Sequence, residues 1–395
     1  VRAEDSGKVD GIKTSTLSYT VTITDVNDNT PAFNPAAYVF TIEEDSSTGT
    51  TVGTLTATDI DDGANQDLSY TITSGNTDNI FRVDKIIATQ VAELIIDDST
   101  NLDYEASQKY SMVLTATDRG SLSSTARIEV IIHGINEETP VFIPSSVYTS
   151  TIAESSAPGS VIMTVSATDG DIGKDGDVFY TLVSGASGKF SIDSISGDLK
   201  IISKLDYETQ IAYTLLISCA DNGINPTAYT STGTVSVFIT DSNDEAPVCT
   251  QNSYVVSLSE NTSPGDVITT LMCSDTDGTS PNRDLLYEMT SGDATFFGIN
   301  MNQLVVWTGA SFDYELVKTF SVTIKVKDQG VPQHFAMVEV TVQISGVNEH
   351  PPVFSAAIYK ISVIEDAAIG TSIGRIIATD ADEGTDGDVR FTISN

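Results

Sequence analysis

The sequence is short of cysteine and of basic residues. Only 3 Cys occur in 395 residues, which excludes a scaffold built on disulfides and a four-cysteine zinc site within the chain. Only 19 Lys and Arg stand against 55 Asp and Glu, so the formal net charge is −36. A chain this acidic repels nucleic acid and anionic membrane surfaces, so we expect neither as a partner. Its surface attracts cations instead.

Long hydrophobic runs and enzyme motifs are also lacking. No run approaches the roughly 20 apolar residues that span a bilayer, so we expect no membrane contact by this segment itself. The sequence starts at Val1 without Met or an apolar signal region, and we expect a segment of a longer protein. It contains no G-x-S-x-G, H-E-x-x-H or G-x-x-x-x-G-K-[ST] motif, and the chain is not expected to be an enzyme.

What the sequence does contain is a long repeat. Four strings align without gaps at intervals of 109, 107 and 105 residues: DVNDNTP (Asp25–Pro31), GINEETP (Gly134–Pro140), DSNDEAP (Asp241–Pro247) and GVNEHPP (Gly346–Pro352). Four further landmarks recur between them in a constant order. They are a Glu five residues before a Gly (Glu44, Glu154, Glu260, Glu365), a D-x-D pair (Asp59/Asp61, Asp169/Asp171, Asp275/Asp277, Asp380/Asp382), a D-Y-E triplet (from Asp103, Asp206 and Asp313) and an isolated Asp (Asp118, Asp221, Asp328). A period of this kind indicates tandem domains.

The segments between landmarks have the pattern of strands. Val, Ile and Thr alternate with polar residues in YTVTITD (Tyr19–Asp25), RIEVIIHG (Arg127–Gly134), TVSVFITD (Thr234–Asp241) and MVEVTVQISG (Met337–Gly346), which is typical of half-buried strands. Seven short strands in about 100 residues predict an all-β antiparallel sandwich. We expect three complete repeats at 31–136, 137–243 and 244–348. Residues 1–30 then form the C-terminal part of another repeat, and residues 349–395 the N-terminal part of a fifth.

The acidic landmarks are expected to meet where two units join. The Glu, the D-Y-E and the linker come from one unit, and the D-x-D and isolated Asp come from the next. We name each junction after its linker asparagine. The predicted clusters are Glu44, Asp103, Glu105, Asn136, Glu137, Asp169, Asp171 and Asp221 (Asn136 junction); Glu154, Asp206, Glu208, Asp241, Asn243, Asp244, Asp275, Asp277 and Asp328 (Asn243 junction); and Glu260, Asp313, Glu315, Asn348, Glu349, Asp380 and Asp382 (Asn348 junction).

Clusters of this kind predict bound Ca²⁺. One carboxylate pair at 4 Å costs about 4 kcal/mol at an effective dielectric of 20, so the charges need cations, protons or separation. Calcium takes six to eight oxygen ligands from flexible carboxylates, amides and carbonyls, whereas Mg²⁺ prefers a tighter octahedron with water. Zinc prefers Cys and His, and the three His are far apart in sequence. The alternative, a merely solvated acidic face, does not explain the recurring order.

The landmarks, above all D-x-N-D-N-x-P, D-Y-E and D-x-D, resemble the extracellular repeats of cadherins over essentially the whole chain. The resemblance implies seven-stranded Greek-key sandwiches of immunoglobulin type in an elongated rod, with up to three Ca²⁺ at each complete junction. Linkers such as GINEE and GVNEH are more at home in long cadherins of the Fat, Dachsous and protocadherin type than in five-repeat cadherins.

The resemblance also assigns ligands. At the Asn243 junction, Glu154, Asp206, Glu208, Asp241 and Asp244 would hold two upper ions. The third ion would take Asn243, Asp275, Asp277 and Asp328, with Asp277 bridging and carbonyls of Glu245 and Asn282 completing the set. The matching linker and loop positions elsewhere are Glu138, Asp175 and Asn65. The Asn27 junction offers Asp25, Asn27, Asp28, Asn29, Asp59, Asp61 and Asp118, but its upper ligands would precede Val1, so we expect it to hold upper ions poorly.

Two junctions depart from the family pattern. Gly134 and Gly346 stand where cadherins have Asp, and Glu137 and Glu349 replace the central Asp of the linker. Glu138 and His350 replace the final Asn. The loss of an anionic ligand suggests that the Asn136 and Asn348 junctions bind calcium more weakly than the Asn243 junction, or hold fewer ions.

Single residues allow further predictions. Cys249 and Cys273 stand where sister units have Phe and Ala, so they either form a disulfide across neighbouring strands or remain two thiols. Cys219 is expected to be a buried free thiol. Trp307 is expected to be a strand residue of the core or surface rather than an adhesive anchor. The sequon Asn261-Thr262-Ser263 makes glycosylation plausible.

The resemblance implies calcium-dependent cell–cell adhesion by the extracellular part of a single-pass plasma-membrane protein. Other cadherin ectodomains, of the same or a different kind, would be its partners. A structural spacer or tension-bearing tether, with recognition elsewhere in a very long chain, is the alternative.

Overall fold

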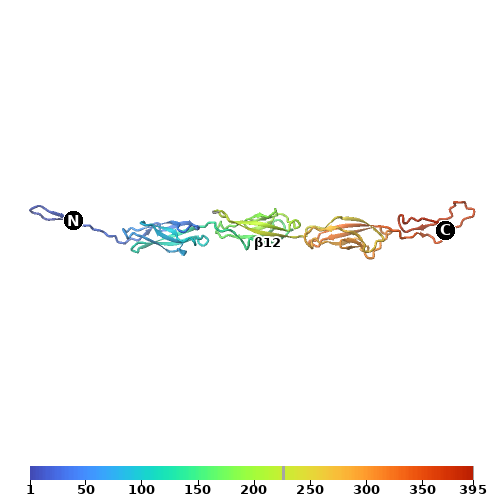
Figure 1. The fold of residues 1–395 in the computed structure, drawn as a ribbon, viewed down its shortest axis with the longest axis horizontal. Coiled ribbons are helices and arrows are strands. Elements are labelled where there is room, and N and C mark those ends of the chain that lie inside the picture. The colour runs from blue at the N-terminus through green and yellow to red at the C-terminus, as the bar shows by residue number, and fades with distance from the viewer. Residues whose placement is uncertain (225–226, 395) are drawn as a thin grey trace.

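The structure is a computed structural model that describes residues 1–224 and 227–394 as an elongated row of β-sandwiches. Three sandwiches follow one another along the long axis, and the two chain ends lie at opposite ends of the row (Figure 1). Among the described residues the one helical element is a 3-10 turn, η1 (Thr77–Asn79), and none of their helices is long or apolar enough to cross a bilayer. The all-β expectation is confirmed.

The first sandwich consists of two four-stranded sheets. One sheet has the order β4 (Ala37–Glu43), β10 (Ser123–His133), β9 (Lys109–Thr117), β6 (Ser69–Ser74). The other has the order β3 (Ala32–Phe33), β5 (Thr51–Thr58), β8 (Val91–Ile96), β7 (Phe81–Lys85). The first strand of the fold is split into β3 and β4, which belong to different sheets. Strand β4 pairs parallel with β10, whereas the other pairs are antiparallel, so the seven strands have a Greek-key arrangement.

The second and third sandwiches repeat this plan with an additional break in the second strand. The second contains β12 (Val147–Ala153), β19 (Thr230–Thr240), β18 (Ala212–Ala220) and β15 (Phe179–Ser184) opposite β13 (Val161–Thr164), β17 (Asp198–Ile201) and β16 (Phe190–Ile192), with β11 (Val141–Ile143) on β14 (Ser166–Thr168). The third contains β21 (Ser253–Ser259), β28 (Phe335–Ser345), β27 (Thr319–Lys327) and β24 (Leu286–Ser291) opposite β22 (Val267–Thr270), β26 (Gln303–Val306) and β25 (Phe297–Asn300), with β20 (Val248–Cys249) on β23 (Cys273–Ser274).

Each sandwich has its own core, built by strands whose side chains alternate. Along β9 and β18 every second side chain is buried, because successive residues of a strand point to opposite faces. The buried residues form three separate clusters, one in each sandwich. Within the described residues no core therefore continues across a junction, and the units are joined by the linker and the acidic side chains around it.

The chain ends contain less regular structure than the pattern predicted. Residues 19–25 are not a strand, although their alternation predicted one, and Ile23 is 92% exposed. No neighbouring strand offers backbone partners there, so the segment has no ladder to join. The N-terminal residues instead form a hairpin of β1 (Arg2–Glu4) and β2 (Thr14–Thr16). At the other end the described strands are β29 (Val353–Phe354) and β30 (Ala378–Thr379), which pair with each other.

The structure answers the questions about single residues of the second and third sandwiches. Cys249 and Cys273 form a disulfide between the paired strands β20 and β23, with a Cα–Cα distance of 3.9 Å. Cys219 is a buried free thiol, as expected. Trp307 directly follows β26 and is 48% exposed, so it is a surface residue rather than a core residue. Asn261 is exposed in the turn after β21, and its glycosylation stays a prediction.

Candidate metal centres at the junctions

A buried glutamate ties the parts of each complete junction together. Glu154 follows β12, and its carboxylate accepts the backbone N–H of Tyr207 in the D-Y-E at 2.5 Å and that of Ser242 in the linker at 2.8 Å. Two other glutamates make the same pair of bonds in their own units: Glu44 accepts from Tyr104 and Ile135, and Glu260 accepts from Tyr314 and Val347. The recurring Glu is therefore a backbone acceptor as well as a negative charge.

The D-x-D pairs form a tight turn that faces the linker of the preceding unit. The N–H of Asp277 donates to Asp275 Oδ1 at 3.0 Å, and Asp61, Asp171 and Asp382 make the same bond. The second Asp of the turn also accepts a linker N–H. Glu138 donates to Asp171 Oδ2 at 3.3 Å, and Glu245 donates to Asp277 Oδ1 at 3.3 Å. These bonds fix the linker to the sandwich that follows it.

The linker asparagines reach the isolated aspartates at two junctions. Asn27 Nδ2 donates to Asp118 Oδ2 at 3.1 Å, and Asn136 Nδ2 donates to Asp221 Oδ2 at 3.3 Å. Asn243 differs, because its amide donates to the carbonyl of Pro332 instead of Asp328. In all three cases the Oδ1 atom of the asparagine is buried without a hydrogen-bond partner. Each amide oxygen is thus available for a cation.

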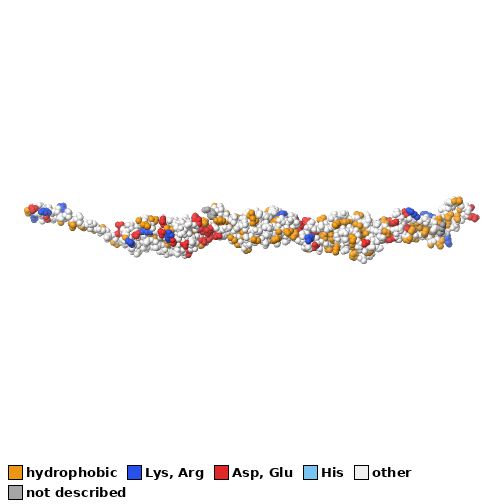
Figure 2. All heavy atoms as spheres, in the orientation of Figure 1, with side chains coloured by type: hydrophobic (Ala, Val, Ile, Leu, Met, Phe, Trp, Pro, Cys, Tyr) orange, Lys and Arg blue, Asp and Glu red, His pale blue; other side chains and the backbone are white. Residues whose placement is uncertain are grey.

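Burial of charge is confined to the junctions. Among the described residues, the buried charged and amide side chains all belong to the predicted landmarks: Glu44, Asp59, Asp61, Asp118, Asn136, Glu154, Asp171, Asp221, Asn243, Glu260, Asp277, Asp328 and Asp382. Figure 2 shows acidic side chains gathered where the first and second sandwiches meet. Carboxylates are almost never buried unless they are paired or bound to metal.

Several of these carboxylates have oxygen atoms that nothing satisfies. Buried oxygens without a hydrogen-bond partner occur, within the described chain, on Asp59, Asp169, Asp171, Asp241, Asp275, Asp277 and Glu315. A buried acceptor left in this state costs about 1–3 kcal/mol or more when charged. Four of these residues, Asp59, Asp241, Asp277 and Glu315, also belong to close groups of acidic side chains. The donor set, carboxylate and amide oxygens, is the one that Ca²⁺ prefers, so the residues fit this ion.

The pKa values reflect the same crowding. Burial raises the pKa of Asp277 to about 6, and the charges of Asp275, Asp241 and Asp244 add to the rise. At the Asn136 junction burial raises the pKa of Glu105, and the negative charge of Glu44 acts in the same direction. Both causes, burial and nearby negative charge, disfavour the ionised form of the carboxyl.

The structure brings thirteen of the predicted ligands into compact groups. Ligand atoms lie within 4.8 Å of one another in five triads: Glu44/Asp103/Glu105, Asp59/Asp61/Asp118, Glu154/Asp206/Glu208, Glu208/Asp241/Asp277 and Glu315/Glu349/His350. Glu208 belongs to two of them and links the D-Y-E with the D-x-D of the next unit. The other predicted ligands, Asp175 and Asp313 among them, are outside these groups. Asn282 uses its side-chain amide, which donates to Asp241 at 3.1 Å, although only its carbonyl was predicted to act.

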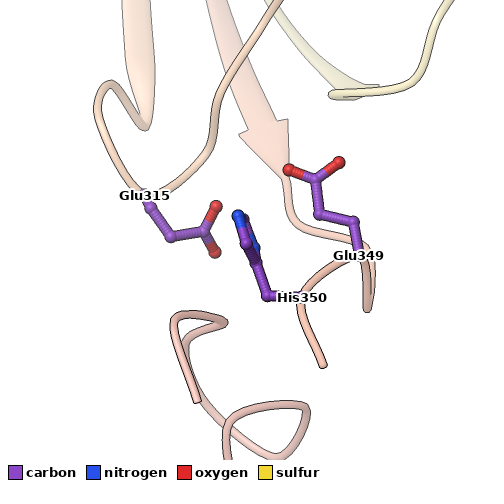
Figure 3. Close-up of side chains that lie close together, drawn as sticks. All are labelled: Glu315, Glu349 and His350. Atoms are coloured by element: carbon purple, nitrogen blue, oxygen red, sulfur yellow. The ribbon is translucent and has the colours of Figure 1, made fainter. Parts of the chain in front are cut away.

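Histidine enters the Asn348 junction, which sequence analysis had noted only as a replacement. His350 lies between Glu315 and Glu349 (Figure 3), and its Nδ1 is 2.9 Å from Asp382 Oδ1. Burial favours neutral Asp382, but hydrogen bonds from His350 leave the pKa of this carboxyl below its usual value. The His350 side chain therefore contacts Asp382. At the equivalent position of the other junctions, Glu138 and Glu245 donate a backbone N–H to Asp171 and Asp277.

Sequence analysis also missed a lysine. Lys204 lies 3.1 Å from Asp244 at the Asn243 junction, whereas Asn101 and Ser311 hold the same place two residues before the D-Y-E of the other units. A charged residue at an otherwise uncharged position was the available signal. Thr279 was missed as well, and its hydroxyl and N–H both donate to Asp241.

Tandem Greek-key sandwiches with buried, unsatisfied carboxylates at each seam define a class of extracellular repeat proteins that take metal ions between repeats. Comparison with known proteins places the chain within that class. The model of the cadherin domain matches residues 38–133, 148–240 and 254–345. The chain belongs to the cadherin family.

Its relatives are large cadherins. It is 34% identical over 395 residues to Protocadherin Fat 4 of Mus musculus, covering 100% of this chain and 8% of that protein. It is 34% identical over 382 residues to Cadherin EGF LAG seven-pass G-type receptor 2 of Mus musculus, covering 96% of this chain and 13% of that protein. The crystal structure of the Protocadherin GammaB4 extracellular domain superimposes with a TM-score of 0.67 at 28% identity, covering 98% of this chain and 61% of that one. The chain thus spans only a small part of these curated relatives.

Family membership confirms the resemblance and the fold. Cadherin repeats are adhesion repeats rather than enzymes, and they generally bind Ca²⁺ at the junctions between repeats. The relatives are plasma-membrane proteins with extracellular repeats.

Proposed function

We propose that this chain is part of a calcium-dependent adhesive ectodomain, in which Ca²⁺ at each junction turns a row of sandwiches into a stiff rod. The observation that supports this most directly is the set of buried junction oxygens without protein partners. Because the cores end at each unit, little else resists bending there. Bound cations would offset the repulsion and join the D-Y-E of one unit to the D-x-D of the next.

Up to three ions would bind at a complete junction. At the Asn243 junction the upper ions would take Glu154, Asp206, Glu208, Asp241 and Asp244, and the third would take Asn243, Asp275, Asp277 and Asp328. The Asn136 junction would use the equivalent residues. The Asn348 junction would use them without the isolated Asp, which the sequence contains only as Asp118, Asp221 and Asp328. Both would bind more weakly, because Gly134 and Gly346 replace Asp. Extracellular modules bind Ca²⁺ with dissociation constants of about 10⁻⁴–10⁻³ M, so millimolar calcium would keep the rod largely loaded.

Calcium removal tests the proposal. With chelator, limited proteolysis should cut in the linkers around Asn136, Asn243 and Asn348 about tenfold faster, because local opening there becomes easier. Small-angle scattering should show a shorter and more flexible particle. The strand interiors provide the internal control, since their cutting should change little. Equal linker cutting with calcium and with chelator would contradict the proposal.

The partners would be other cadherin ectodomains, and the chain would lie outside the cell in a single-pass protein. A second role is a spacer or tension-bearing tether within a very long chain, and the great length of its relatives supports it. Bead aggregation separates the two. Beads coated with this chain should aggregate in calcium if it carries recognition itself, and they should stay dispersed if it is a spacer.

A further inference from the structure

We propose that the Lys204 ammonium group competes with the upper calcium ions for carboxylate oxygens at the Asn243 junction. This junction would then bind calcium at a higher concentration than it would without the lysine. The proposal rests on the calcium binding proposed above and adds a residue that sets its affinity.

The position of the ammonium group carries the argument. Lys204 Nζ lies 3.1 Å from Asp244 Oδ2, and Lys204 lines the same hollow as Glu154, Asp206 and Glu208. The pKa of Lys204 is raised because its ammonium group donates to Asp244 and lies near Glu154 and Glu245. The side chain thus occupies the mouth of the site where calcium would enter.

Competition follows from ligand chemistry. Calcium binds the carboxylate oxygens directly, and Asp244 cannot offer the same oxygen fully to an ammonium group and to an ion. The Lys204 side chain is 74% exposed, so calcium can displace it into water. An exposed ion pair of this kind contributes little free energy. Calcium at millimolar concentration can therefore displace Lys204 from Asp244.

The other complete junctions offer an internal comparison. The equivalent residues Asn101 and Ser311 carry no charge. At the Asn136 junction Glu137 occupies the place of Asp244, and burial together with the charges of Glu44, Glu105 and Asp171 raises its pKa. A lysine at this position is therefore a feature of the Asn243 junction alone. At the Asn348 junction a different lysine, Lys318, pairs with Glu383 rather than with a linker carboxylate.

Hydrogen–deuterium exchange with mass spectrometry on the whole chain can test this, because it reports each linker separately. Calcium titrations should give a protection midpoint for residues 134–140, 241–247 and 346–352. Lys204→Asn, which installs the residue found at position 101, should lower the midpoint at 241–247 by about two- to sixfold, the range that follows from releasing a weak exposed pair. The other two midpoints should not move.

Matched variants sharpen the result. Lys200→Asn removes the same charge from a lysine that lies 3.9 Å from Asp198 rather than at the junction, and it should leave the midpoint at 241–247 unchanged. In an Asp244→Asn background Lys204→Asn should have no further effect. The reverse change, Asn101→Lys, should raise the midpoint at 134–140.

The outcomes separate this proposal from the one it rests on. If all three linkers respond to calcium but Lys204→Asn leaves or raises the midpoint at 241–247, the role of Lys204 is overturned while calcium binding stands. The same holds if Lys200→Asn lowers the midpoint as much as Lys204→Asn does. If no linker gains protection with calcium, both proposals fail.

Discussion

The Asn136 and Asn243 junctions have the same landmarks but place the tyrosine of the D-Y-E differently. At the Asn136 junction a Cβ added to Gly134 would lie 2.7 Å from Cδ1 of Tyr104, so the ring covers the glycine that replaces the linker Asp. At the Asn243 junction the linker keeps Asp241, and the Tyr207 ring lies over Gly278 instead, where an added Cβ would be 2.3 Å from Cε1.

The Asn348 junction follows the first arrangement. A Cβ added to Gly346 would lie 2.8 Å from Cδ1 of Tyr314. The residue that follows the D-x-D is large in both such junctions, Ile172 and Glu383, and it is glycine only at position 278. The comparison teaches that a ligand is not lost independently of its surroundings. The tyrosine ring of the D-Y-E lies against a glycine at each of these junctions. Where that glycine follows the D-x-D, as Gly278 does, the linker has room for Asp; where the glycine is in the linker, as Gly134 and Gly346 are, it takes the place of the Asp.

The largest expected effect tests what the two junctions share. Glu44→Ala and Glu154→Ala should each destabilise the adjoining units by about 2–5 kcal/mol in chelator, because two backbone N–H groups lose their acceptor and an unsatisfied buried donor costs about 1–3 kcal/mol. Differential scanning calorimetry measures the loss.

Glu43→Ala is the matched control, since Glu43 is the exposed neighbour of Glu44 and its side chain is 56% exposed. It should change stability by less than about 0.5 kcal/mol. Clearly unequal losses of unfolding free energy in Glu44→Ala and Glu154→Ala would contradict the inference that the buried Glu has the same role at both junctions.

The next effect concerns pH in the absence of calcium. The pKa of Asp277 is about 6 in the fold, above the ordinary value of 3.8, so the folded state takes up a proton before the unfolded state does. This contribution to stability is complete below pH 3.8 and is lost as pH rises through about 6. In chelator the melting temperature should therefore rise by roughly 5 °C between pH 7 and pH 5.

Calcium should reverse this trend, because the ion binds only the ionised carboxylate. Asp277→Asn should raise the melting temperature at pH 7 in chelator and remove most of its pH dependence. Asp171, whose pKa is also raised by burial, should respond with the same sign at the Asn136 junction. A melting temperature that falls on acidification in chelator would show that the crowding at Asp277 is relieved in another way.

The smallest effect addresses the tyrosine ring directly. Gly134→Asp alone should not improve calcium binding at the Asn136 junction, since the Tyr104 ring occupies the space. Combined with Ile172→Gly, which opens the place that Tyr207 uses at the other junction, it should lower the calcium midpoint about threefold, because an additional carboxylate ligand tightens the site. Hydrogen–deuterium exchange of residues 134–140 measures it.

Ile172→Gly alone is the control and should leave the midpoint unchanged, because the N–H of residue 172 that donates to Glu105 at 3.2 Å is kept. If Gly134→Asp alone lowers the midpoint as much as the pair does, the ring position is not what separates the two junctions.

Much of the architecture could be predicted because it repeats. The alternation in segments such as 127–134 and 234–241 marked strands that the structure contains as parts of β10 and β19. The same alternation in residues 19–25 predicted a strand that the structure does not contain, because a strand also needs a neighbouring strand with free backbone groups. The pairing of Cys249 with Cys273 was left open by the pattern, and the register of β20 with β23 decided it.

Within the site, the predictable part was the identity of the acidic residues. Their spacing recurs, and repulsion among carboxylates made a cation necessary. Sequence spacing did not reveal Lys204, His350 or the tyrosine rings as determinants, since each acts through a contact between residues far apart in the chain or across two units.

The sequence by itself determined the repeat, the sandwich and the class of ion, because strand periodicity and carboxylate chemistry are local properties of residues. Tertiary structure alone decided which oxygens are left without partners, which carboxylate faces a lysine or histidine, and where each aromatic ring lies. Those outcomes depend on how two neighbouring units are placed relative to each other. The strength of each interaction at a junction is set by the distance between the groups in space, which the order of residues along the chain does not give.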